Sequence, residues 1–194
     1  SQLTPDEIRF LQRSAEYNQT DIQLGQTMVQ KCDAPSLKTY GQRLADDHTL
    51  ANQQLQSIIA QTGATVPTAP NPDQQQMLDR LNGLSGTDID RAAIDDSMRS
   101  QERQINLDMQ AANNSQNPEV KAYAQQNLTI NQDELNQCRG LNVPAPTAAP
   151  VYSTPPATTV APVIVPPPPP AVEPVPPPPS ERPAGPGISP QQPQ

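Results

Sequence analysis

The residues of this chain best suited to chemistry are one histidine and several acidic side chains. His48 is the only histidine in the 194 residues, and Asp47 precedes it. An imidazole can act as a general base or bind a metal, but nucleophilic catalysis requires a paired nucleophile, and none is paired with His48 in the sequence. We therefore expect a buried histidine that is hydrogen-bonded within the core. The alternatives are a single weak metal site formed with Glu16 or Glu134, and a catalytic role.

Two adjacent acid pairs, Asp46-Asp47 and Asp95-Asp96, are candidate carboxylate dyads. Neighbouring residues on a helix point in different directions, so at most one member of each pair faces inward. Solvated helix faces explain both pairs better than a dyad. The chain also contains no CxxC pair, Gly-rich phosphate loop or GxSxG motif. We expect no catalytic residue, no cofactor and no bound metal.

Four long segments have the start and stop signals of helices. The first opens with the capping box Thr4-Pro5-Asp6-Glu7 and ends near Cys32. The second begins at Asp33-Ala34-Pro35-Ser36 and ends at Gly63. The third begins after Thr87 and breaks at Asn113-Asn114-Ser115, and the fourth runs from Asn117-Pro118-Glu119 to Gly140. A short helix is predicted over residues 73–81, within a proline-containing linker.

Each long segment carries one inward-facing stripe at steps of three and four residues. The stripes are Ile8, Leu11, Ala15, Asn18, Ile22, Gly25 and Val29; Leu37, Tyr40, Leu44, His48, Ala51, Leu55 and Ile58; Ile94, Met98, Gln101, Ile105, Met109 and Ala112; and Val120, Ala124, Leu128, Asn131, Leu135 and Cys138. The fold class predicted is all-α: a four-helix bundle domain over residues 1–142. The long connection between its second and third helices is typical of the crossover in ferritin-like bundles.

The crossover places Cys32 and Cys138 at the same end of the bundle. In an up-down-up-down bundle these residues would lie at opposite ends, too far apart for the ~7 Å that a disulfide allows between Cα atoms. With the third helix parallel to the second, the fourth runs parallel to the first. We therefore expect a Cys32–Cys138 disulfide, with two buried free thiols as the alternative.

These segments resemble a large bacterial family of exported, ferritin-like helical proteins whose domain is of unknown function. The matching stretches are Phe10-Leu11, Ile22-Gln23-Leu24-Gly25, Tyr40-Gly41-Gln42-Arg43-Leu44-Ala45-Asp46-Asp47-His48-Thr49-Leu50-Ala51-Asn52, Ile89-Asp90-Arg91-Ala92 and Pro118-Glu119-Val120-Lys121-Ala122-Tyr123-Ala124. The resemblance implies periplasmic export. It also implies that Gln101 and Glu134 stand where the family tends to place further histidines.

Residues 143–194 differ in composition and hold most of the 26 prolines. Proline fixes φ and lacks an amide donor, so this proline-rich tail is expected to be an extended, polyproline II or disordered segment. It could be a spacer, an inert end, or a strap along a partner's surface. The expected partner-binding residues of a strap are Tyr152, Val160, Val163, Ile164, Val165, Pro166, Pro167, Pro168, Pro169, Pro170, Pro176, Pro177, Pro178 and Pro179.

Charge and hydropathy exclude some partners. The net charge is −8 and the basic residues are scattered, which argues against nucleic-acid binding. No apolar run is long enough to span a membrane. The first residue is Ser1 rather than Met, which fits a mature exported form.

Together these features predict a non-catalytic periplasmic accessory subunit that docks on a larger membrane-associated enzyme. Its architecture is similar to that of the small third subunit of membrane-bound quinohaemoprotein alcohol dehydrogenases. The alternatives are a free-standing envelope protein with a proline-rich spacer, and a degenerate ferritin-like metal-binding protein.

Overall fold

The computed structural model describes residues 2–62 and 64–142, and every regular element in these ranges is a helix. The helices are α1 (Pro5–Lys31), α2 (Pro35–Ile59), α3 (Pro72–Asn82), α4 (Gly86–Asn114) and α5 (Pro118–Arg139). The all-α prediction is confirmed. None of these helices is long and apolar enough to cross a membrane. The expected tail, including its proposed partner-binding residues, lies outside the described residues.

Local signals place most helix ends where the sequence predicted them. Thr4 caps α1 through its side chain and forms the expected capping box with Glu7, and Asn117 caps α5. The short helix α3 begins with a second capping box, formed by Asn71 and Gln74. Two ends differ: α2 stops at Ile59, before Gly63, and α4 begins at Gly86 rather than after Thr87.

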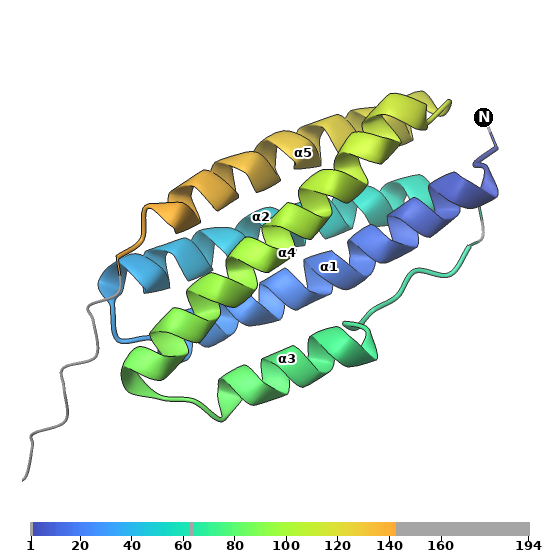
Figure 1. Ribbon diagram of the computed structural model, residues 1–194. Coiled ribbons are helices and arrows are strands. Elements are labelled where there is room, and N and C mark those ends of the chain that lie inside the picture. The colour runs from blue at the N-terminus through green and yellow to red at the C-terminus, as the bar shows by residue number, and fades with distance from the viewer. Residues whose placement is uncertain (1, 63, 143–194) are drawn as a thin grey trace, which may run out of the picture. The chain divides into compact units, whose positions relative to one another are not determined.

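The long helices lie side by side, with α3 alongside α1 and α4 (Figure 1). Contacts between α1 and α4 run in opposite directions along the two helices, since Glu7 reaches Asn117 whereas the Asp33 amide reaches Asp90. Helix α2 is antiparallel to α1, because His48 contacts Asn18 near their middles while Gly41 lies against Gly25. Helix α4 therefore runs parallel to α2, and the segment containing α3 returns along the bundle.

The core consists of two apolar clusters, one toward each end of the long helices. One cluster contains Phe10, Leu11, Leu55, Val120 and Tyr123. The other contains Leu24, Met28, Tyr40, Ile89 and both cysteines, together with Leu78 and Leu81 of α3. The residues buried between these clusters are mostly polar. The interior therefore has an apolar–polar–apolar order along the bundle.

The polar middle explains where the predicted stripes were wrong. On α4, Met98 and Ile105 are only partly buried and Met109 is 43% exposed. Gln101 is buried as predicted, and Ser97, Ser100, Gln104 and Asp108 occupy the inward face in place of the three apolar residues. On α1, Asp21 is fully buried in place of Ile22, and on α5, Asn127 is buried in place of Leu128.

The backbones of α1 and α2 come into close contact at two glycines, Gly25 and Gly41. A Cβ atom on Gly25 would lie 2.3 Å from the Gly41 carbonyl oxygen and 2.9 Å from the Ala45 nitrogen. Both are backbone atoms, so no side-chain rearrangement could relieve the clash. Glycine at this position sets the distance between the two helices and, through it, the position of His48.

We predict that Gly25→Ala destabilises the domain by about 1–3 kcal/mol, because the helices must separate to admit the methyl group. Urea unfolding followed by circular dichroism measures this change. Gly83→Ala is the matched control, since its Cβ would meet no atom closer than 3.4 Å and its φ of −80° suits alanine. Equal stability of the two variants would contradict the close-contact interpretation.

Candidate functional site

A layer of buried polar side chains crosses the middle of the bundle, and His48 lies at its centre. His48 Nδ1 is 2.9 Å from Asn18 Oδ1, and Nε2 is 3.1 Å from Glu134 Oε2 and 3.4 Å from Asp21 Oδ2. The three charged residues are at most 2% exposed. These contacts confirm the expected buried, hydrogen-bonded histidine. Because both ring nitrogens face oxygen atoms, a doubly protonated ring can donate on both sides.

Asp21 accepts hydrogen bonds from three side chains of α4. Its Oδ1 accepts from Ser100 Oγ at 2.8 Å, and its Oδ2 accepts from Gln101 Nε2 at 3.3 Å and from Gln104 Nε2. Ser100 and Gln104 lie one helical turn apart, and Gln101 lies three residues before Gln104, so all three side chains can reach the same carboxylate. Asp21 thus joins α1 to α4 and to His48 of α2.

A second pair extends the layer between α4 and α5. Asp108 Oδ2 accepts a 2.7 Å hydrogen bond from Asn131 Nδ2, and both residues are buried. Toward α1, Asn18 Nδ2 donates to the Tyr123 hydroxyl at 3.1 Å. Each of the four long helices therefore contributes polar groups to the same layer.

Burial and charge act against each other at His48. Burial disfavours the charged ring, but the carboxylates of Asp21 and Glu134 outweigh it and raise the pKa of His48 to about 9. Burial raises the pKa values of Asp21 and Glu134, and the His48 charge opposes that rise. Burial also raises the pKa of Asp108 to about 7, against the hydrogen bond from Asn131.

The arrangement does not fit a two-metal centre. Such centres in helical bundles use carboxylates from all four helices and two histidines. No group of three or more His, Cys, Asp or Glu side chains in the described part of the chain is placed to hold a metal ion. Gln101 and Glu134, the expected substitutes for histidines, both lie in the layer. Glu16 does not, since its carboxylate accepts from Asn71 near the surface.

Several acceptors in the layer lack a donor from the described residues. Gln101 Oε1, Asn131 Oδ1 and Glu134 Oε1 are buried without a hydrogen-bond partner. Buried polar atoms are normally satisfied by protein or ordered water.

At most one member of each acid pair faces inward, as helix geometry predicts, but the burial of Asp96 contradicts the solvated face expected for its pair. Asp46 and Asp47 accept from Gln42 and Arg43 on the outer face of α2. Asp95 is exposed, whereas Asp96 is buried and pairs with Arg80 at 2.6 Å and with Arg99. Neither pair is a dyad.

Cys32 and Cys138 lie in one apolar cluster, at the same end of the bundle. The expected disulfide is not formed in the structure, in which both are buried free thiols. Each thiol has other partners: Cys138 Sγ donates to the Ile94 carbonyl at 3.6 Å, and Cys32 interacts with Asp90. Burial and Asp90 raise the pKa of Cys32 to about 12, so it is a poor nucleophile.

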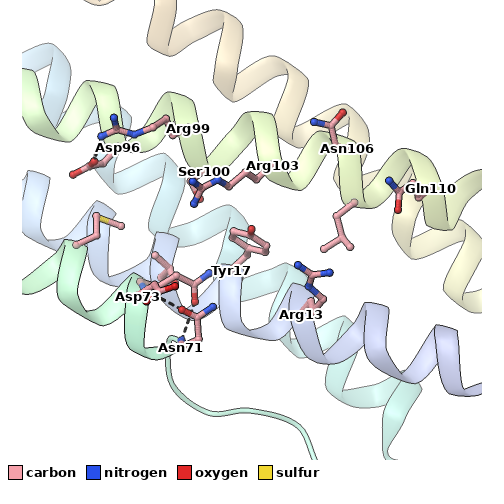
Figure 2. A pocket seen from close by; sticks show the side chains of 14 residues that line it. Arg13, Tyr17, Asn71, Asp73, Asp96, Arg99, Ser100, Arg103, Asn106 and Gln110 are labelled. Atoms are coloured by element: carbon pink, nitrogen blue, oxygen red, sulfur yellow. Dashed lines mark hydrogen bonds and ion pairs between the residues drawn. The ribbon is translucent and has the colours of Figure 1, made fainter.

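An open cleft of about 570 Å³ lies between α1, α3 and α4 (Figure 2). Ser100 lines this cleft and also donates to Asp21, so it borders both the cleft and the buried layer. The sequence offered no signal for the cleft, because its residues come from three helices.

Residues 1–141 match the model of the family described as domain of unknown function DUF4142. The chain belongs to this family. A DUF305 fragment from Deinococcus radiodurans has a similar crystal structure, with a TM-score of 0.65 and 15% identity, covering 72% of this chain and 97% of that one. At this identity the likeness concerns the fold alone. No curated protein sequence matches the chain.

Sequence reasoning missed Asp21, the central carboxylate of this DUF4142 domain. The residue continues the inward spacing of Ser14 and Asn18 toward Leu24 and Met28, all of which are buried. The predicted stripe contained the adjacent apolar residue Ile22 instead of Asp21. A heptad-like spacing that includes polar residues would have found it.

We predict that Asp108→Asn raises the free energy of unfolding, relative to the wild type, by roughly 2–3 kcal/mol more at about pH 8 than at about pH 5. The folded-state pKa of about 7 exceeds the ordinary 3.8, so the folded state binds more protons between these values. The stability contributed by protonated Asp108 is therefore lost as pH rises toward 7. Asparagine carries no charge at either pH and can still accept from Asn131.

Urea unfolding of the wild type and the variant at both pH values measures this effect. Asp133→Asn is the control, since Asp133 is exposed on α5. An identical pH dependence in wild type and Asp108→Asn would show that Asp108 ionises freely in the folded state.

Proposed function

We propose that this protein is a non-catalytic accessory protein of an exported compartment, which docks on a larger protein. The observation that carries this proposal is the sealing of the layer around His48. The imidazole is 2% exposed and is engaged by Asn18, Asp21 and Glu134. A substrate could not reach the imidazole without opening the bundle. The contacts of His48 therefore serve to hold the helices together rather than to bind a substrate.

The remaining reactive groups support the same proposal. Burial raises the thiol pKa values of Cys32 and Cys138, which keeps both protonated. The acid pairs are solvated or bound to arginines. None of these groups is thus both accessible and paired with an activating base, which nucleophilic catalysis requires.

The finer form of the proposal concerns location and partner. We propose that the helices form a ferritin-like four-helix bundle with a long crossover, and that the chain is periplasmic. The partner would be a membrane-associated enzyme complex such as a quinohaemoprotein alcohol dehydrogenase, with the proline-rich residues 143–194 acting as a strap. Polyproline II suits this role because it loses little entropy when it docks. A free-standing envelope protein with a spacer tail is the alternative.

We predict that a chain ending at Asn142 folds like the full chain but loses most of its association with the partner. The helices end at Arg139, with Gly140 as the C-cap of α5, so the truncation leaves every described core contact in place. Pull-down from solubilised membranes with the full and truncated chains measures association, and thermal unfolding measures the fold. Unchanged association of the truncated chain would refute the strap, and its unfolding would make residues 143–194 part of the domain.

One observation favours a degenerate ferritin-like metal-binding protein instead. The unpartnered Gln101 Oε1 and Glu134 Oε1 could accept from an ordered water or contact a small cation. Under our proposal, elemental analysis of gently purified protein gives no stoichiometric transition metal, because His48 is the only imidazole of the chain. Two tightly bound iron ions per chain would establish the metal-binding function in its place.

A further inference from the structure

The cleft between α1, α3 and α4 gathers positive charge on an acidic protein. Arg13, Arg99 and Arg103 line it, against the carboxylates of Asp73 and Asp96, whereas the whole chain carries a net charge of −8. Asp96 is already paired with Arg99 and with Arg80. Arg13, Arg103 and Asp73 are therefore left, and their two positive charges outweigh one negative charge in the cleft.

Arg13 and Arg103 make no ion pair or side-chain hydrogen bond with any residue in the described ranges. They come from different helices, α1 and α4 (Figure 2). By contrast, Arg9 and Arg43 pair with carboxylates one helical turn away, Asp6 and Asp47. Two arginines that face one cleft without such partners have their full donor capacity available.

Neutral polar groups surround these arginines. Tyr17 lies one turn from Arg13 on α1, and Asn106 and Gln110 continue the face of Arg103 on α4. Their side chains also make no hydrogen bond to a residue in the described part of the chain. The cleft is therefore lined by two guanidinium groups, one phenol and two amides that have no partner among the described residues.

We propose that this cleft binds a small molecule bearing an oxyanion, a carboxylate or a phosphate, between Arg13 and Arg103. Guanidinium groups bind both anions through paired, charge-assisted hydrogen bonds. Asn106, Gln110 and the Tyr17 hydroxyl bind the polar remainder of the ligand. The volume of about 570 Å³ lies within the range of small-molecule sites. This proposal does not rest on the accessory function proposed above.

The test is isothermal titration calorimetry of the full chain at low ionic strength, where such contacts are least screened. Inorganic phosphate and citrate are the two probes. We expect saturable binding of one ligand per chain, weakened about tenfold to a hundredfold by Arg13→Gln or by Arg103→Gln. Binding of phosphate alone identifies a phosphate-bearing ligand, and binding of citrate alone identifies a carboxylate-bearing one.

Arg139→Gln is the matched control, because it removes the same charge from a residue that pairs with Glu102 away from the cleft. Arg13 and Arg103 are both exposed, so their substitution leaves the core intact, and thermal unfolding of each variant verifies this. Absence of saturable binding for both probes overturns the proposal. Equal weakening by Arg139→Gln overturns it as well, since the effect would then reflect net charge alone. Neither result bears on association with a larger protein, which the pull-down measures.

Discussion

The burial of His48 between Asp21 and Glu134 is the constraint on which the rest of the structure depends. An isolated buried charge would cost several kcal/mol, so each of these groups is tolerable only while the others are in place. Because the partners come from α1, α2 and α5, and Asp21 takes its other donors from α4, the charges fix the relative positions of all four long helices. A shift of one helix by a turn would leave a buried charge unpaired.

This constraint also explains the composition of the helices. The layer uses Asn, Gln and Ser as buried donors and acceptors, so the middles of α4 and α5 present polar residues inward. Apolar packing is confined to the two ends of the bundle, and the close contact of Gly25 with Gly41 lies beside one of them. Satisfied polar layers specify register, because alternative registers leave their members without partners.

The sequence predicted what depends on local signals. Helix ends follow from caps such as Thr4 and Asn117, whose side chains bond to nearby backbone amides, and these ends are confirmed. The burial of His48 was predicted because its neighbours on α2 are apolar. Asp21 and Asp108 were missed because the predicted stripes followed the adjacent apolar residues Ile22 and Met109, which are partly buried and exposed, respectively. The sequence near Asp21 does not indicate its hydrogen bond with Ser100. The two residues lie far apart in the chain and come into contact through the antiparallel packing of α1 and α4.

The same packing separates the charges of the domain into two environments. Carboxylates that would repel one another on the surface are placed inside, where His48 and the amide donors stabilise them. On the outer faces of α1 and α4, Arg13 and Arg103 line the cleft without pairing to a described carboxylate, since the nearby Glu16 accepts from Asn71 instead. Ser100 stands at the boundary, since it lines the cleft and donates to Asp21. Helix α4 thus presents one face to the buried layer and the adjoining face to the arginine-lined cleft.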